Sequence, residues 1–130
     1  MNHENNVDLL YKQECFEIQG AVFEVYKTIG VGFLESIYHE CLSIELKKRQ
    51  IPFESEVQIE FRYKENKLQQ YFKADLICYG KIILELKAVK AIEPIHRAQL
   101  INYLKVTGLR LGLLINFHSY PKVNIERLIL

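Results

Sequence analysis

Residues 70–88 read QYFKADLICYGKIILELKA, two runs of alternating apolar residues separated by a short polar break at Tyr79-Gly80. Alternation of this kind is typical of two β-strands joined by a turn. One face of each expected strand is wholly apolar: Phe72, Ala74, Leu76 and Cys78 in the first, and Ile82, Leu84 and Leu86 in the second. The other faces carry Asp75 in the first strand, and Glu85 and Lys87 in the second. Charged side chains are rare in the middle of buried strands unless they are paired or bind something.

The length of the turn decides whether Asp75 and Glu85 meet. A loop of odd length, such as Tyr79-Gly80-Lys81, places Asp75 directly across from Glu85, with Cβ atoms about 4.5–5.5 Å apart. A two-residue turn would send the two carboxylates to opposite faces of the sheet. Carboxylates that close repel each other unless a proton or a cation lies between them. The spacing leaves two interpretations open: a site for a hard cation such as Mg²⁺ with Lys87 beside it, or a buried salt-bridge network.

The rest of the chain predicts an α/β fold. Apolar spacing near 3.6 residues predicts helices at 8–28 and 33–49, and Pro94 and Gly108 delimit a third helix at 94–107. The apolar stripes of the first two helices include Phe16, Val22, Phe23 and Tyr26, and then Leu34, Ile37, Tyr38, Cys41, Leu42 and Leu46. Strands are expected at 57–63, 70–78, 81–88 and 109–117, with an edge strand at 123–130. We expect residues 1–130 to form one domain, with a central mixed β-sheet flanked by helices, in which the strands around the third helix are parallel.

Two of the expected helices carry further candidate residues. His96, Gln99 and Tyr103 form a polar stripe, typical of a solvated face, on a helix that directly follows the strand ending at Lys87. Glu35 falls in the first turn of its helix, where the helix dipole alone is a sufficient reason for a carboxylate. It is alternatively a third carboxylate aimed at the cation.

Composition restricts the class of protein. Of the 130 residues, 49% are hydrophobic and 25% charged, as in an ordinary globular chain and unlike a disordered one. No apolar run approaches the roughly 20 residues of a membrane helix, and the polar N-terminus does not resemble a secretory signal. The three cysteines are far apart and lack a CxxC pair, which favours reduced thiols over a disulfide framework or a zinc site. We therefore expect a cytoplasmic protein.

The net charge of +1 conceals an asymmetry. Residues 1–45 carry two basic and eight acidic side chains, a balance of −6, whereas residues 47–130 carry fifteen basic and eight acidic ones, a balance of +7. Such a chain can present one positive surface to a polyanion. Solvated faces without a binding role are the simpler interpretation of the charges taken alone.

In combination, these residues resemble a known family. Asp75, Glu85-x-Lys87 and a later helix with Gln99 and Tyr103 resemble the core of the PD-(D/E)XK nuclease superfamily. Over about residues 10–130 the chain also resembles the GxxExxY family within it, through the segments Gly32-x-x-Glu35-x-x-Tyr38, Glu85-Leu86-Lys87-Ala88, Pro94-Ile95-His96, Gln99-Leu100-x-Asn102-Tyr103-Leu104 and Gly112-Leu113-Leu114-Ile115-Asn116-Phe117. Ala74 stands where the family usually has proline before the aspartate.

The resemblance implies a restriction-endonuclease-like fold and a set of roles. Glu35, Asp75 and Glu85 would be ligands of Mg²⁺ or Mn²⁺, and Lys87 would be the catalytic lysine. Gln99 and Tyr103 would be accessory catalytic groups near the scissile phosphate. The implied activity is metal-dependent hydrolysis of phosphodiester bonds in DNA or RNA.

Two other functions fit the sequence. The domain could be a catalytically silent nuclease-fold module that binds nucleic acid or a protein partner, since a fold does not guarantee an activity. The charges could also be purely structural, with no metal. An exposed edge strand near the C-terminus would permit a homodimer, and no membrane partner is expected.

Overall fold

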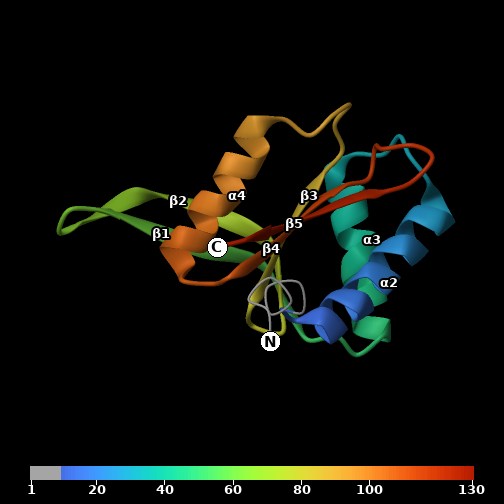
Figure 1. Ribbon diagram of the computed structural model, residues 1–130, viewed down its shortest axis with the longest axis horizontal. Coiled ribbons are helices and arrows are strands. Elements are labelled where there is room, and N and C mark those ends of the chain that lie inside the picture. Colours follow the sequence, from blue (N-terminus) through green and yellow to red (C-terminus); the bar gives the residue numbers. More distant parts are fainter. Residues whose placement is uncertain (1–9) are drawn as a thin grey trace, which may run out of the picture.

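The computed structural model describes residues 10–130 and consists of a five-stranded sheet with helices on both faces (Figure 1). The strand order is β1-β2-β3-β4-β5, with β3 and β4 parallel and all other neighbours antiparallel. This confirms the mixed α/β fold. The elements are α2 (Lys12–Ile29), α3 (Glu35–Lys48), β1 (Phe53–Tyr63), β2 (Asn66–Cys78), β3 (Ile82–Lys87), α4 (Pro94–Thr107), β4 (Leu111–Asn116) and β5 (Asn124–Ile129).

Two element boundaries differ clearly from expectation. The first helix begins at Lys12, and residues 8 and 9 of the expected helix lie outside the described residues. β1 and β2 each begin four residues earlier than the alternation predicts, because Phe53 pairs with Cys78 at one end of the hairpin and Asn66 pairs with Tyr63 at the other. The turn is therefore confined to two residues, 64 and 65, and the hairpin projects beyond the other strands (Figure 1).

The sheet separates two apolar clusters. One lies between the sheet and the pair α2 and α3, and it contains the buried side chains Ile18, Val22, Tyr38, Leu42, Leu46, Leu84, Leu113 and Phe117. The other lies under α4 and contains Ile59, Ala74, Ile83, Leu100, Leu104 and Leu114. Burial of these two sets supplies the main driving force for folding and fixes β3 and β4 in the middle of the molecule.

Several residues of the expected helical stripes lie outside the core. Phe16 and Phe23 of α2 are 68% and 52% exposed, although the spacing predicts them to be buried. The face of α2 that packs against the core is instead Cys15, Ile18, Ala21, Val22 and Val25. Leu34 and Ile37 are exposed for the same reason, since Tyr38, Leu42 and Leu46 make the contact of α3. The burial of Val22 in α2, and of Tyr38, Leu42 and Leu46 in α3, is confirmed, so the predicted stripes were too wide on one side.

The apolar face expected along β2 is also wrong, because it changes sides at Asp75. Phe72 and Ala74 belong to the α4 cluster, whereas Leu76 and Cys78 belong to the cluster under α2 and α3. Residues two apart in a regular strand share a face, so the backbone of β2 is irregular at Asp75, although its pairing register with β1 is the same on both sides of that residue. Opposite Asp75, Glu56 of β1 has a φ of +52°, a left-handed conformation that breaks the alternation of β1 at the same point.

Two global expectations concern cysteines and membranes. Cys15, Cys41 and Cys78 are free thiols in the structure. Within residues 10–130, no helix combines the length and the apolar character needed to cross a bilayer.

The contact between α4 and β4 gives a test of the fold. A Cβ atom added to Gly112 would lie 2.8–2.9 Å from three side-chain carbons of Leu100, so Gly112→Ala overpacks the α4 cluster. We expect this substitution to lower the free energy of unfolding by about 1–3 kcal/mol, measured by urea denaturation. In a Leu100→Ala background the added methyl group has room, so the two losses should not add. If the losses in the free energy of unfolding caused by Gly112→Ala and Leu100→Ala were fully additive, the contact between Gly112 and Leu100 would be contradicted.

Candidate active site

The two acids predicted to face each other do so where β2 and β3 separate. The hairpin loop has three residues, Tyr79–Lys81, and the ladder pairs Cys78 with Ile82 and Leu76 with Leu84. The next facing pair, Asp75 and Glu85, is linked through side chains instead of ladder bonds. The Asp75 amide donates to Oε1 of Glu85 at 3.4 Å, and the Leu86 amide donates to Oδ2 of Asp75 at 2.7 Å. The odd-length turn and the neighbouring carboxylates are therefore confirmed.

Burial makes this pair of carboxylates unusual. Glu85 is only 4% exposed, and burial, together with the nearby charge of Asp75, raises its pKa to about 8. Burial also raises the pKa of Asp75, against the opposing effects of the Leu86 amide, His39 and Lys87. The charge of Asp75 therefore disfavours the ionised form of Glu85, and the charge of Glu35 adds to the raised pKa of both acids.

No salt-bridge network neutralises the pair. Within residues 10–130, the ion pairs of 4.0 Å or less involve Glu14, Glu45, Glu60 and Glu126, and none involves Asp75 or Glu85. Lys87 lies at the end of β3 and lowers the pKa of both acids without contacting either as an ion pair. The buried Glu85 and the half-buried Asp75 thus lack a contacting cation from the described part of the chain.

Glu35 approaches the same region from α3. Its Oε1 accepts a hydrogen bond of 3.3 Å from the amide of Ala88, the residue that follows Lys87. The loop before Glu35 is anchored by Tyr38, whose hydroxyl donates to the Gly30 carbonyl at 2.6 Å while its ring stacks on Phe117. These contacts give the residues of Gly32-x-x-Glu35-x-x-Tyr38 distinct structural roles: Gly32 has a φ of +104°, and Tyr38 fixes the start of the helix that presents Glu35.

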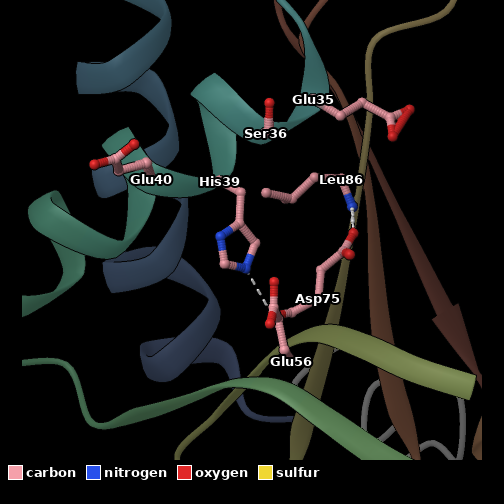
Figure 2. A pocket seen from close by; sticks show the side chains of 7 residues that line it. All are labelled: Glu35, Ser36, His39, Glu40, Glu56, Asp75 and Leu86. Carbon is pink, nitrogen blue, oxygen red and sulfur yellow. Dashed lines mark hydrogen bonds between the residues drawn. The ribbon is translucent and has the colours of Figure 1, made fainter.

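A cavity of about 310 Å³ opens between α3 and the strands. Figure 2 shows His39 and Glu40 of α3 at the left, Asp75 and Leu86 to their right, Glu35 above Leu86, and Glu56 below. The lining residues are Glu35, Ser36, His39, Glu40, Glu56, Asp75 and Leu86. The sequence analysis missed Ser36, His39, Glu40 and Glu56. The polar run Glu35-Ser36 followed by His39-Glu40, one helical turn later, was the available signal for all but Glu56.

The donors that could bind a metal are two adjacent carboxylates and a third nearby. Among the described residues, no group of three or more His, Cys, Asp or Glu side chains is close enough to hold a metal ion. Asp75 and Glu85 still suit a hard divalent cation, which prefers carboxylate oxygens and retains several waters. The structure therefore brings together two of the three expected ligands, while Glu35 contacts the Ala88 amide.

The residues expected on α4 divide into different environments. Tyr103 stacks on Phe72 with ring centroids 3.7 Å apart, and burial and the charges of Glu85 and Asp75 raise its pKa to about 12. Tyr103 is thus electrostatically coupled to the acid pair. Gln99, one turn earlier, is exposed. His96 caps its own helix, because its Nδ1 accepts a 3.0 Å hydrogen bond from the Glu93 amide.

Asn116 is a supporting residue whose role the sequence analysis did not identify. It pairs with Lys87 across the parallel strands and is 2% exposed. Its side-chain amide donates to the Val89 carbonyl at 2.9 Å, and its Oδ1 accepts from the Val89 amide at 3.1 Å. Asn116 therefore fixes the chain immediately after Lys87. A buried asparagine ending an otherwise apolar strand was the signal.

A mixed sheet flanked by helices, with two acids and a lysine where two strands diverge, defines an α/β domain with an acidic candidate site at the edge of a strand gap. A family model described as "PD-(D/E)XK nuclease superfamily" matches residues 12–128, nearly the whole chain. The protein belongs to this superfamily.

Comparison with solved structures supports the fold. The crystal structure of SSO0001 superposes with a TM-score of 0.57 at 22% sequence identity, over 72% of this chain and 48% of that one. The chain thus spans about half the length of this structural relative. No curated protein matches the sequence.

The raised pKa of Glu85 predicts how metal-free stability depends on pH. The folded protein retains a proton on Glu85 up to about pH 8, whereas the unfolded chain releases it near the ordinary value of 4.5. Since the folded state binds more protons in this window, the free energy of unfolding should fall as pH rises from 5 to 8.5. Asp75 contributes in the same direction.

Urea denaturation in EDTA at several pH values measures this effect. In Glu85→Gln, the free energy of unfolding should fall much less as the pH rises. Above pH 8 this variant should be more stable than the wild type, because an amide carries no charge to bury. The exposed Glu54→Gln is the matched control and should retain the wild-type slope. A pH-independent wild type would contradict the burial of the pair.

Proposed function

We propose that this protein is a Mg²⁺- or Mn²⁺-dependent nuclease of the GxxExxY type, which hydrolyses phosphodiester bonds of nucleic acid. The observation that carries the proposal is the pair formed by the buried Glu85 and the half-buried Asp75, which no cation of the described chain contacts, beside Lys87. Superfamily membership supports the reaction class. The cavity next to Asp75 would give a phosphate group access to the pair.

The chain's own residues have distinct roles in this proposal. Asp75 and Glu85 would hold the metal, with Glu35 as a further ligand. A divalent cation supplies charge for the phosphoryl oxygens and a more acidic water. Lys87 would orient the attacking water or stabilise negative charge in the transition state. Tyr103 and Gln99 would contact the phosphate or the leaving group from α4.

Nucleic acid binding would involve the basic part of the chain. The projecting β1–β2 hairpin carries Arg62, Lys64 and Lys67, and its exposed Tyr63 and Tyr71 offer aromatic faces on which bases stack. Lys67 is engaged with Glu60 at 3.0 Å. Phosphate contacts of this kind are largely independent of sequence and weaken with salt.

A silent nuclease-fold module is the second candidate. The observation in its favour is that the third carboxylate, Glu35, contacts the Ala88 amide and forms no three-ligand group with the pair. Such a module would bind nucleic acid or a protein without turnover. A cytoplasmic location, and a homodimer through the exposed edge of β5, stay predictions.

Nuclease assays distinguish the two functions. With Mg²⁺ or Mn²⁺ and single-stranded DNA, double-stranded DNA or RNA, we expect cleavage by the wild type, and a loss of about 10²-fold or more in Asp75→Asn and Lys87→Ala. Glu54→Gln and Lys27→Ala, which change exposed side chains of the same types, should retain activity.

Two outcomes would contradict the proposed activity. Equal cleavage by the wild type and both site variants would show that this site does not carry the reaction. Binding to nucleic acid that persists in EDTA and in Asp75→Asn, without cleavage under any condition, would favour the silent module.

A further inference from the structure

His39 makes a specific contact with the main chain of Asp75. Its Nε2 lies 3.0 Å from the Asp75 carbonyl oxygen, a bond drawn in Figure 2, and 3.1 Å from Oγ of Ser55. A carbonyl oxygen only accepts hydrogen bonds, so the chemistry assigns the proton to Nε2. His39 therefore acts as a donor toward Asp75, in a half-buried position at the wall of the cavity.

The main chain of Asp75 depends on such contacts because it lies in a gap of the sheet. The β2–β3 ladder ends at Leu76 and Leu84, and the β1–β2 ladder omits the pair of Glu56 and Asp75. Its amide bonds to the Glu85 carboxylate and its carbonyl to His39. A buried carbonyl that loses its partner carries a free-energy cost, and the segment can then rotate.

The position of His39 also links Asp75 to the third candidate ligand. His39 follows Glu35 by four residues, one helical turn along α3, so both side chains leave the same face of the helix. Two side chains of α3 therefore contact the strands. Glu35 accepts a hydrogen bond from the Ala88 amide just after β3, and His39 donates to the Asp75 carbonyl in the irregular part of β2. Ser55 of β1 lies beside the ring of His39.

We propose that His39 is a positioning residue, which holds the Asp75 backbone so that the Asp75 carboxylate faces Glu85 and the Leu86 amide. The part of this inference that concerns the metal rests on the proposed function. The part that concerns the orientation of Asp75 is a property of the metal-free protein and can be tested separately.

Amide hydrogen exchange in EDTA tests the orientation. The Leu86 amide reports on the Asp75 carboxylate, to which it donates at 2.7 Å, and the Asp75 amide reports on Glu85. In His39→Leu, we expect both amides to exchange roughly five- to tenfold faster, with unchanged exchange at the centre of β4. His39→Gln, whose side-chain amide can donate from a similar distance, should restore slow exchange. His118→Leu is the matched control at an exposed histidine.

Mn²⁺ titration calorimetry on the same variants tests the consequence. We expect His39→Leu to weaken Mn²⁺ binding by about tenfold, the scale of a lost contact behind a ligand, and His39→Gln to restore most of it. If the wild type binds no Mn²⁺, the proposed function is contradicted. The exchange rates of the Leu86 and Asp75 amides in EDTA would still show whether His39 orients Asp75. Wild-type exchange at Leu86 and Asp75 in His39→Leu, or a His39→Gln variant as impaired as His39→Leu, would overturn the inference.

Discussion

The repulsion that the charge of Asp75 exerts on the buried carboxylate of Glu85 governs this structure. Asp75 and Glu85 face each other in a gap between β2 and β3, where burial disfavours their charged forms and the charge of Asp75 further raises the pKa of Glu85. A protein could avoid this cost with two apolar residues, as it does one ladder step away at Leu76 and Leu84. A divalent cation bound by both carboxylates would offset the free-energy cost of burying them and of their repulsion. This is the basis of the proposed activity.

The surrounding structure keeps the gap open and orients its groups. The Leu86 amide, released from the β2–β3 ladder, binds the Asp75 carboxylate, while Asn116 secures the chain beyond Lys87. On the opposite face, the bidentate contact of Arg97 with Glu126 fastens α4 to β5, so that Tyr103 remains near the acids. Most of these contacts involve residues distant in sequence, so the site forms only when the sheet is complete.

The sequence predicted the facing acids because the loop length and the alternation of β3 are local properties. It could not predict the face change at Asp75, which depends on the left-handed backbone of Glu56 in a neighbouring strand. Alternation therefore assigned Phe72 and Ala74 to the wrong side. His39 was missed for a similar reason: its partner is a backbone carbonyl of another element, and no pattern in the sequence of α3 identifies that contact.

The location of a bound metal is the most direct test of the central claim. Anomalous diffraction from crystals soaked in Mn²⁺ should show a peak between the carboxylates of Asp75 and Glu85, at about 2.0–2.3 Å from an oxygen of each. A map without a peak there, in which the ammonium group of Lys87 sits between the two acids, would contradict the account. Lys87 would then neutralise the pair, and the charges of the site would be structural.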